Sequence, residues 1–138
     1  MLVHDAARCL LQPAWVDRLV DACLADDVGG LLALPLADTL KAEQEGRVQG
    51  TVSRSGKWAA QTPQMFRIGA LQAALAERAA SGFAGITDEA SAIERQGLQP
   101  RLVEGTAQNF KVTYPADFAL AEAVLAARAK TPPHKEST

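Results

Sequence analysis

Apolar residues follow two spacings in the first part of the chain, and each spacing predicts a different element. The continuous runs at residues 1–3 and 31–36 predict strands, the first buried and the second covered on both faces. Between them, apolar residues recur at helical spacing from Pro13 to about Asp26, and proline suits the first turn of a helix. Strand, helix and strand in this order predict a βαβ unit with a right-handed crossover and a parallel sheet.

The middle of the chain loses this periodicity. Residues 37–55 are polar, and residues 39–41 could pair with 49–54 across a turn at 43–46, which predicts a protruding hairpin arm. Such an arm has little core of its own and usually needs a partner surface. The alternative is a surface loop. Residues 58–66, which contain the sequence Gln-Thr-Pro-Gln, are interpreted as an irregular connection.

The second half predicts three helices and two short strands. In chain order these are a helix over 67–80, a helix that Thr87 caps and that ends at Gly97, strands at 101–104 and 110–112, and a helix that begins at Pro115. Residues 131–138 contain two prolines and two charged residues and predict a disordered tail. We therefore expect one α/β domain over residues 1–130.

Composition narrows the function classes. The chain has 138 residues, of which 48% are hydrophobic and 22% charged, as is usual for a soluble globular protein. A net charge of −2 gives no reason to expect nucleic acid or an acidic membrane as a partner. The sequence has no apolar run of about 20 residues that could span a bilayer, and we expect no signal peptide. Two isolated cysteines fit a reducing cytosol, which predicts a cytoplasmic protein.

The stretch from Val3 to Arg8 carries the first candidate chemistry. Asp5 could hold a divalent cation, and the planar guanidinium of Arg8 fits a phosphate, so the pair favours a site for a metal-bound phosphate. The alternative is a strand end with a surface ion pair. His4 and Asp5 are adjacent on a strand and point to opposite faces, so they cannot form a dyad with each other. Further side chains that suit phosphate lie in predicted turns, although each alone is more often a cap or a solvated residue: Thr39, Arg54, Thr62, Thr87 and Lys111.

Several other chemistries lack their motifs. The sequence contains no G-x-S-x-G elbow for an activated serine and neither of the glycine-rich motifs G-x-x-x-x-G-K-[ST] and G-x-G-x-x-G. With only two histidines and no C-x-x-C, a zinc site built from histidine and cysteine is not expected.

Five blocks of sequence occur together and in order. They are VHDAAR (3–8), LPLADTLK (34–41), TVSRSGKWAAQTPQMF (51–66), ITDEASAIE (86–94) and LVEGTAQNFKVTYPADFALAEA (102–123). Together they resemble the 2-C-methyl-D-erythritol 4-phosphate cytidylyltransferase family of non-mevalonate isoprenoid biosynthesis. The resemblance covers essentially the whole chain except the tail. It implies a Rossmann-like α/β nucleotidyltransferase fold with a mixed, mostly parallel sheet and a protruding arm.

The resemblance also implies a reaction and its ligands. The family joins CTP to methylerythritol phosphate, gives 4-diphosphocytidyl-2-C-methyl-D-erythritol and releases pyrophosphate, with Mg²⁺ as cofactor. By motif, Asp5 would hold the metal and Ala6 would line the nucleotide site. A further four residues would bind methylerythritol phosphate: Arg8, Thr62, Thr87 and Lys111.

The arm has its own role in this resemblance. Thr39 and Arg54 lie on it and would reach across a homodimer into the partner's site. Arg54 and Lys111 would position the substrate phosphate for attack. No covalent enzyme intermediate is needed, because the phosphate oxygen is already a nucleophile and catalysis rests on positioning and charge neutralisation.

The chain departs from the family in one respect. The family begins with a glycine-rich, basic loop that cradles the CTP triphosphate, and no such segment precedes Val3. We therefore expect an N-terminally truncated, C-terminal portion of the enzyme with little transfer activity of its own. Two alternatives stay open: a non-catalytic fragment that dimerises or binds substrate, and a cytidylyltransferase for another polyol phosphate such as ribitol phosphate.

Overall fold

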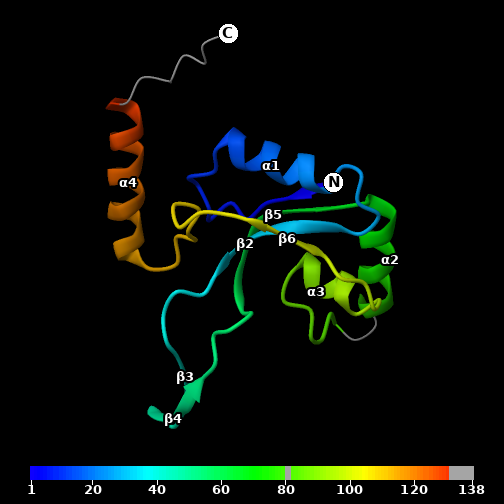
Figure 1. The fold of residues 1–138 in the computed structure, drawn as a ribbon, viewed down its shortest axis with the longest axis horizontal. Helices are drawn as coiled ribbons and strands as arrows, with labels where there is room; N and C mark the ends of the chain where they lie inside the picture. The colour runs from blue at the N-terminus through cyan, green and yellow to red at the C-terminus, as the bar shows by residue number, and fades with distance from the viewer. Residues whose placement is uncertain (80–81, 131–138) are drawn as a thin grey trace.

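A mixed sheet forms the body of the molecule. The computed structural model describes residues 1–79 and 82–130, and within them four strands form one sheet in the order β1-β5-β2-β6 (Figure 1). The strands are β1 (Leu2–Val3), β2 (Gly29–Pro35), β5 (Trp58–Phe66) and β6 (Arg101–Glu104). Strands β1, β2 and β6 share one direction, and β5 runs against them.

The position of β5 corrects the predicted βαβ unit. Strands β1 and β2 run in the same direction, as predicted, but β5 lies between them and pairs antiparallel with both. The reason is the arm: β5 begins where the chain returns from it, so Trp58 pairs with Pro35 at the end of the strand that led into it. Among the described strands only the β2–β6 pairing is parallel.

The prediction of an irregular connection at residues 58–66 was wrong. The segment is the nine-residue strand β5, and its pairing with β2 shifts register between Leu31 and Ala33. The shift lies close to Pro63, which follows Thr62 through a cis peptide bond. Proline has no N–H to give to the ladder, so inside a sheet it is tolerated only at edges or at such irregularities.

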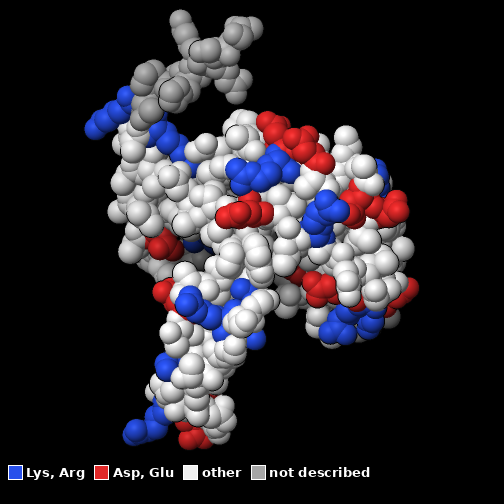
Figure 2. Space-filling model, in the orientation of Figure 1, with Lys and Arg blue, Asp and Glu red and all other residues white. Residues whose placement is uncertain are grey.

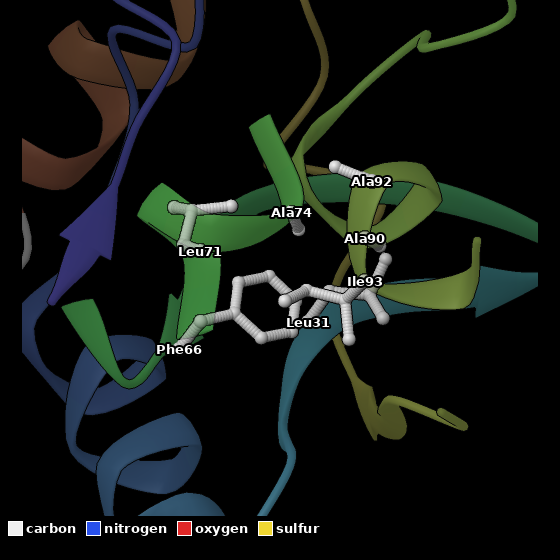
Figure 3. Close-up of a cluster of buried hydrophobic side chains, with 7 residues drawn as sticks. All are labelled: Leu31, Phe66, Leu71, Ala74, Ala90, Ala92 and Ile93. Carbon is white, nitrogen blue, oxygen red and sulfur yellow. The ribbon is translucent and has the colours of Figure 1, made fainter. Parts of the chain in front are cut away.

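Helices cover both faces of this sheet. Helix α1 (Pro13–Cys23) begins at the predicted proline and ends three residues before the predicted Asp26. It packs on one face, where Trp15, Leu19 and Leu32 are buried together. On the opposite face α2 (Ile68–Ala79) and α3 (Glu89–Glu94) cover a second cluster that contains Leu31, Phe66, Leu71 and Ile93 (Figure 3). Adjacent residues of β2 thus serve different cores, because successive side chains of a strand point to opposite faces.

Strand β1 is an edge strand rather than the predicted buried one. Met1 and Leu2 are 47% and 41% exposed, and Val3 is half-buried. The apolar run at the start of the chain therefore predicted the strand correctly but its burial incorrectly.

Three further predictions differ from the structure. The N-cap of α3 is Asp88, whose carboxylate accepts a hydrogen bond from the Ser91 amide, rather than Thr87. That helix ends at Glu94, before the predicted Gly97. Residues 110–112 form no strand. The Val112 amide donates to the Ala7 carbonyl in the turn after β1 at 2.9 Å, and the Lys111 carbonyl accepts from the Thr113 hydroxyl at 3.3 Å.

The last helix, α4 (Pro115–Lys130), begins at the predicted proline. Of its described residues only Ala121 is buried, while Phe118, Leu120 and Leu125 are about half exposed or more. Near its C-terminal end Arg128 donates to the Leu10 carbonyl at 2.7 Å. The predicted tail at residues 131–138 lies outside the described residues. In the part of the chain that is described, no helix is long and apolar enough to cross a membrane.

The predicted arm is present. Strands β3 (Leu40–Gln44) and β4 (Arg47–Val52) pair antiparallel and extend away from the sheet (Figure 1). Glu45 and Gly46 form the turn with φ of 52° and 76°, as tight hairpin turns require. Every residue from 37 to 55 is described, and each is exposed or half-buried, so the arm has no core of its own.

Candidate functional site

A cavity of about 470 Å³ lies beside the end of β1 and brings together five of the predicted site residues. Its lining includes Asp5, Arg8, Thr62, Thr87 and Lys111. These residues come from the turn after β1, from β5, from the position before the N-cap of α3 and from the segment after β6. Residues more than a hundred positions apart in the sequence therefore share one cavity.

An ion pair joins two of these residues directly. The Lys111 ammonium lies 2.6 Å from the Asp5 carboxylate, and the second carboxylate oxygen accepts a hydrogen bond from the Ala7 amide at 3.0 Å. The Lys111 contact and, after it, the Ala7 amide lower the pKa of Asp5 from its ordinary value. The ion pair keeps both charges at the cavity, with about half of the Lys111 side chain exposed to solvent.

Arg8 is held against the backbone. Its guanidinium donates to the Asn109 carbonyl at 2.6 Å and to the Ala60 carbonyl at 3.3 Å. Burial lowers the pKa of Arg8 from its ordinary value, and the nearby Asp5 charge opposes this effect. An arginine pinned in this way presents a fixed positive charge to the cavity, because the guanidinium stays protonated in proteins.

The Thr62 hydroxyl lies at the centre of a small network. It accepts a hydrogen bond from the Asp5 amide at 3.0 Å and contacts His4 Nδ1 at 3.0 Å. His4 Nε2 contacts the Arg8 carbonyl at 3.1 Å. His4 also lines the cavity, although its sequence position predicted only that it forms no dyad with Asp5.

Two buried amides that had no predicted role hold the cavity walls together. Gln64, 1% exposed, donates to the Asp88 carboxylate at 2.9 Å and accepts from the Ala90 amide at 2.8 Å, which ties β5 to the start of α3. Asn109, 0% exposed, donates to the Thr62 carbonyl at 2.8 Å. Both lie within matched blocks of the sequence, at 51–66 and 102–123, but the identity of a polar residue does not distinguish a buried amide from a surface one.

The remaining predicted residues do not join this cavity. Thr39 and Arg54 line a separate cavity of about 410 Å³ on the arm. The Arg54 guanidinium donates to the carbonyls of Leu36 and Ala37 at the base of the arm. Ala6 is exposed in the turn beside Asp5 and is not part of the cavity lining.

The balance of acidic and basic residues differs between the cavity beside β1 and the arm. The cavity beside β1 holds three acids, Asp5, Asp88 and Glu89, against two basic residues, Arg8 and Lys111. Figure 2 shows basic side chains gathered along the arm and its base. Over residues 37–57 the sequence has four of them, Lys41, Arg47, Arg54 and Lys57, against three acids.

The donors present suit a metal that arrives with a phosphate ligand. Within residues 1–79 and 82–130, no group of three or more histidine, cysteine or acidic side chains could hold a metal ion by itself. Asp5 supplies one carboxylate at the cavity. Mg²⁺ is commonly bound through one or two carboxylates together with substrate phosphates and water, so Asp5 fits this mode of binding.

Comparison with known proteins decides the family. The sequence model of "IspD: 2-C-methyl-D-erythritol 4-phosphate cytidylyltransferase" matches residues 1–127. The chain belongs to this family. A cytidylyltransferase of this name from Chromobacterium violaceum is 61% identical over 129 residues, which cover 93% of this chain and 56% of the relative. The bifunctional enzyme IspD/IspF of Albidiferax ferrireducens is 62% identical over 128 residues, covering 93% of this chain and 30% of that protein.

Solved structures of the family share the fold. A crystal structure of 4-diphosphocytidyl-2C-methyl-D-erythritol synthase superposes with a TM-score of 0.82 at 48% identity, covering 90% of this chain and 55% of that one. The cytidylyltransferase from Thermus thermophilus gives a TM-score of 0.82 at 34% identity, covering 91% and 61%. The chain spans about half the length of most of the curated relatives that it matches.

Proposed function

We propose that this chain supplies the methylerythritol-phosphate-binding part of a Rossmann-like cytidylyltransferase. The complete site joins CTP and 2-C-methyl-D-erythritol 4-phosphate to give 4-diphosphocytidyl-2-C-methyl-D-erythritol and pyrophosphate. The observation that carries the proposal is the convergence of Asp5, Arg8, Thr62, Thr87 and Lys111 on one cavity. The chain's membership of the family supports the same reaction.

The reaction needs positioned charge rather than an enzyme nucleophile. A phosphate oxygen of the substrate attacks the α-phosphorus of CTP, and the bond to the β-phosphate breaks as pyrophosphate leaves. Lys111 and Arg8 hold the substrate phosphate for this attack. Lys111 is paired with Asp5 in the ligand-free chain, so the incoming phosphate shares or takes over that contact. Such charge-assisted hydrogen bonds are stronger than neutral ones.

In this proposal the nucleotide and its metal would bind beside Asp5. Asp5 would hold Mg²⁺, which when bound neutralises charge on the phosphates of CTP. The small side chain of Ala6, exposed in the same turn, lets the nucleotide approach the backbone closely.

A homodimer completes the site in this proposal. Thr39 and Arg54 lie on an arm without a buried residue, and a two-stranded hairpin of this kind is marginal without a partner. Arg54 then positions the substrate phosphate in the partner's cavity. Deletion of residues 38–53 should convert the dimer to a monomer in sedimentation experiments, while far-UV circular dichroism retains the signal of the body. A chain that is monomeric at micromolar concentration before the deletion would contradict this role of the arm.

The transfer reaction can be tested in a chimera. The matching segment of the Chromobacterium violaceum relative, 61% identical to this chain, is replaced by this chain, and pyrophosphate release is measured with CTP, Mg²⁺ and methylerythritol phosphate. We expect turnover comparable to that of the unaltered relative. A folded chimera without turnover would refute the proposed function. Faster turnover with ribitol phosphate would indicate that the natural substrate is another polyol phosphate.

A further inference from the structure

His4 makes hydrogen bonds through both of its ring nitrogens. Nε2 lies 3.1 Å from the Arg8 carbonyl, and Nδ1 lies 3.0 Å from the Thr62 hydroxyl. A backbone carbonyl can only accept, so Nε2 must carry the hydrogen. In the neutral ring Nδ1 is then an acceptor, because a neutral imidazole has one N–H and one lone pair.

This tautomer fixes the direction of the Thr62 hydroxyl hydrogen. A threonine hydroxyl has one hydrogen to donate and two lone pairs that accept. The hydrogen is donated to His4 Nδ1, and one lone pair accepts from the Asp5 amide at 3.0 Å. One lone pair of Thr62 is left, and Thr62 lines the cavity. The hydroxyl can therefore accept a hydrogen bond from a ligand, and it has no hydrogen left to donate to one.

We propose that His4 is a positioning residue that orients the Thr62 hydroxyl to accept a hydrogen bond from a hydroxyl group of the substrate's polyol. The proposal rests on the proposed function and assigns different parts of the substrate to different residues. A phosphate dianion offers only acceptors, so it pairs with the cations Arg8 and Lys111. A polyol hydroxyl offers a hydrogen, so it suits the remaining lone pair of Thr62. His4 thereby favours a polyol phosphate over a bare phosphate.

The tautomer is tested without any ligand. The chain has only two histidines, His4 and His134, so ¹⁵N-histidine labelling gives two ring systems, and a His4→Phe variant assigns them. In mildly alkaline buffer, where imidazoles are neutral, we expect His4 to carry its hydrogen on Nε2. We also expect the Nδ1 resonance to shift in Thr62→Val, which removes the donor. A hydrogen on Nδ1, or an Nδ1 resonance that Thr62→Val leaves unchanged, would overturn the proposal.

The effect on binding is tested with two ligands, methylerythritol phosphate and inorganic phosphate. His4→Phe should weaken binding of methylerythritol phosphate by about three- to tenfold, the range for one neutral hydrogen bond, and leave that of inorganic phosphate unchanged. His4→Asn should recover most of the affinity, because its amide oxygen lies near the position of Nδ1 and can still accept from Thr62. Equal losses for both ligands, or no recovery in His4→Asn, would overturn the proposal.

A double-mutant cycle separates positioning from general loosening of the cavity. The effects of His4→Phe and Thr62→Val on methylerythritol phosphate affinity should be non-additive, since His4 acts through Thr62. Thr87→Val is the matched control, because Thr87 lines the same cavity and, within the described residues, no hydrogen bond joins its side chain to His4. Its effect should add to that of His4→Phe. Additivity in both cycles would overturn the proposal. If the parent chain binds no methylerythritol phosphate, the proposed function fails, and the ring-nitrogen measurement alone decides whether His4 orients Thr62.

Discussion

The cavity beside β1 and the arm present their basic side chains in opposite ways. Lys111 lies on the cavity wall, where it pairs with Asp5 at 2.6 Å, two residues after the fully buried Asn109. Arg54 lies on an arm without a buried residue and donates to backbone carbonyls of its own chain. The cavity side of the candidate site is thus preorganised by the body of the protein. Arg54, by contrast, is held at the exposed base of the arm by the carbonyls of Leu36 and Ala37, with no buried residue around it on the arm.

The largest difference between the two regions should be in stability. Phe66→Ala removes a side chain that is 2% exposed at the centre of one core cluster, and it should lower the free energy of unfolding by about 3–5 kcal/mol. Val48→Ala on the arm, where the side chain is 66% exposed, should change it by less than about 0.5 kcal/mol. Urea denaturation followed by circular dichroism measures both. Equal losses would mean that the arm belongs to the same cooperative core as the sheet.

A second comparison concerns the two basic residues in binding. Lys111→Ala should weaken methylerythritol phosphate binding by a factor that corresponds to about 1.5–3 kcal/mol, because it removes one charge-assisted phosphate contact. Arg54→Ala should have a similar effect in a dimer and no effect on a monomer. Calorimetric titrations of the chain with and without residues 38–53 provide the measurement. Lys130→Ala, at the end of α4, is the control for a loss of net charge. If Arg54→Ala weakened binding equally in both forms, Arg54 would act within its own chain.

A third comparison uses two glutamines. Gln64 bonds to the Asp88 carboxylate and the Ala90 amide inside the cavity wall, whereas Gln49 donates to Gln44 on the exposed arm at 3.0 Å. Gln64→Leu should lower the free energy of unfolding by about 1–3 kcal/mol, because it leaves buried polar groups without partners. Gln49→Leu should be nearly neutral. Faster hydrogen exchange at the Ala90 amide in Gln64→Leu alone would locate the effect, and equal exchange in the two variants would contradict it.

Features that depend on residues close together in the sequence could be predicted, and features that depend on pairing between distant segments could not. The arm, α1, β2, β6 and the start of α4 at Pro115 were predicted, because each depends on a local pattern of apolar residues or on a proline. Strand β5 was missed because its polar residues and Pro63 resemble a loop until the pairing with β1 and β2 is known. The prediction of Thr87 as the cap missed by one residue, because the neighbouring Asp88 is also a good capping residue and the sequence pattern does not decide between them.

Predictions about the candidate site succeeded and failed for the same reason. The five cavity residues were singled out as side chains that suit a metal or a phosphate and then given roles by resemblance in short motifs, and the structure places them around one cavity. Their supports, Gln64 and Asn109, were missed because their burial depends on segments distant in the sequence. His4 was set aside by an argument from strand geometry, but β1 ends at Val3, and His4 and Asp5 both line the cavity. Its contacts with Thr62 and Arg8 arise from the turn that follows β1.

The smallest expected effect is on the titration of Asp5. Its pKa lies below the ordinary value, mainly through the hydrogen bond from Lys111 and next through the Ala7 amide. The charged form is thus favoured in the folded chain, so its contribution to stability is present above the ordinary carboxyl pKa. That contribution is lost as the pH falls through the folded-state value.

Lys111→Ala should therefore raise the pKa of Asp5 part of the way back, with the Ala7 amide still lowering it. The pKa of Asp117 is lowered by the Tyr114 and Thr113 amides and should stay where it is, which makes Asp117 the internal control. Carbon-detected NMR titration of the carboxyl groups follows both residues in one experiment. An Asp5 pKa that does not move in Lys111→Ala would mean that the ion pair is absent in solution. Lys111 would then be as weakly preorganised as Arg54 on the arm.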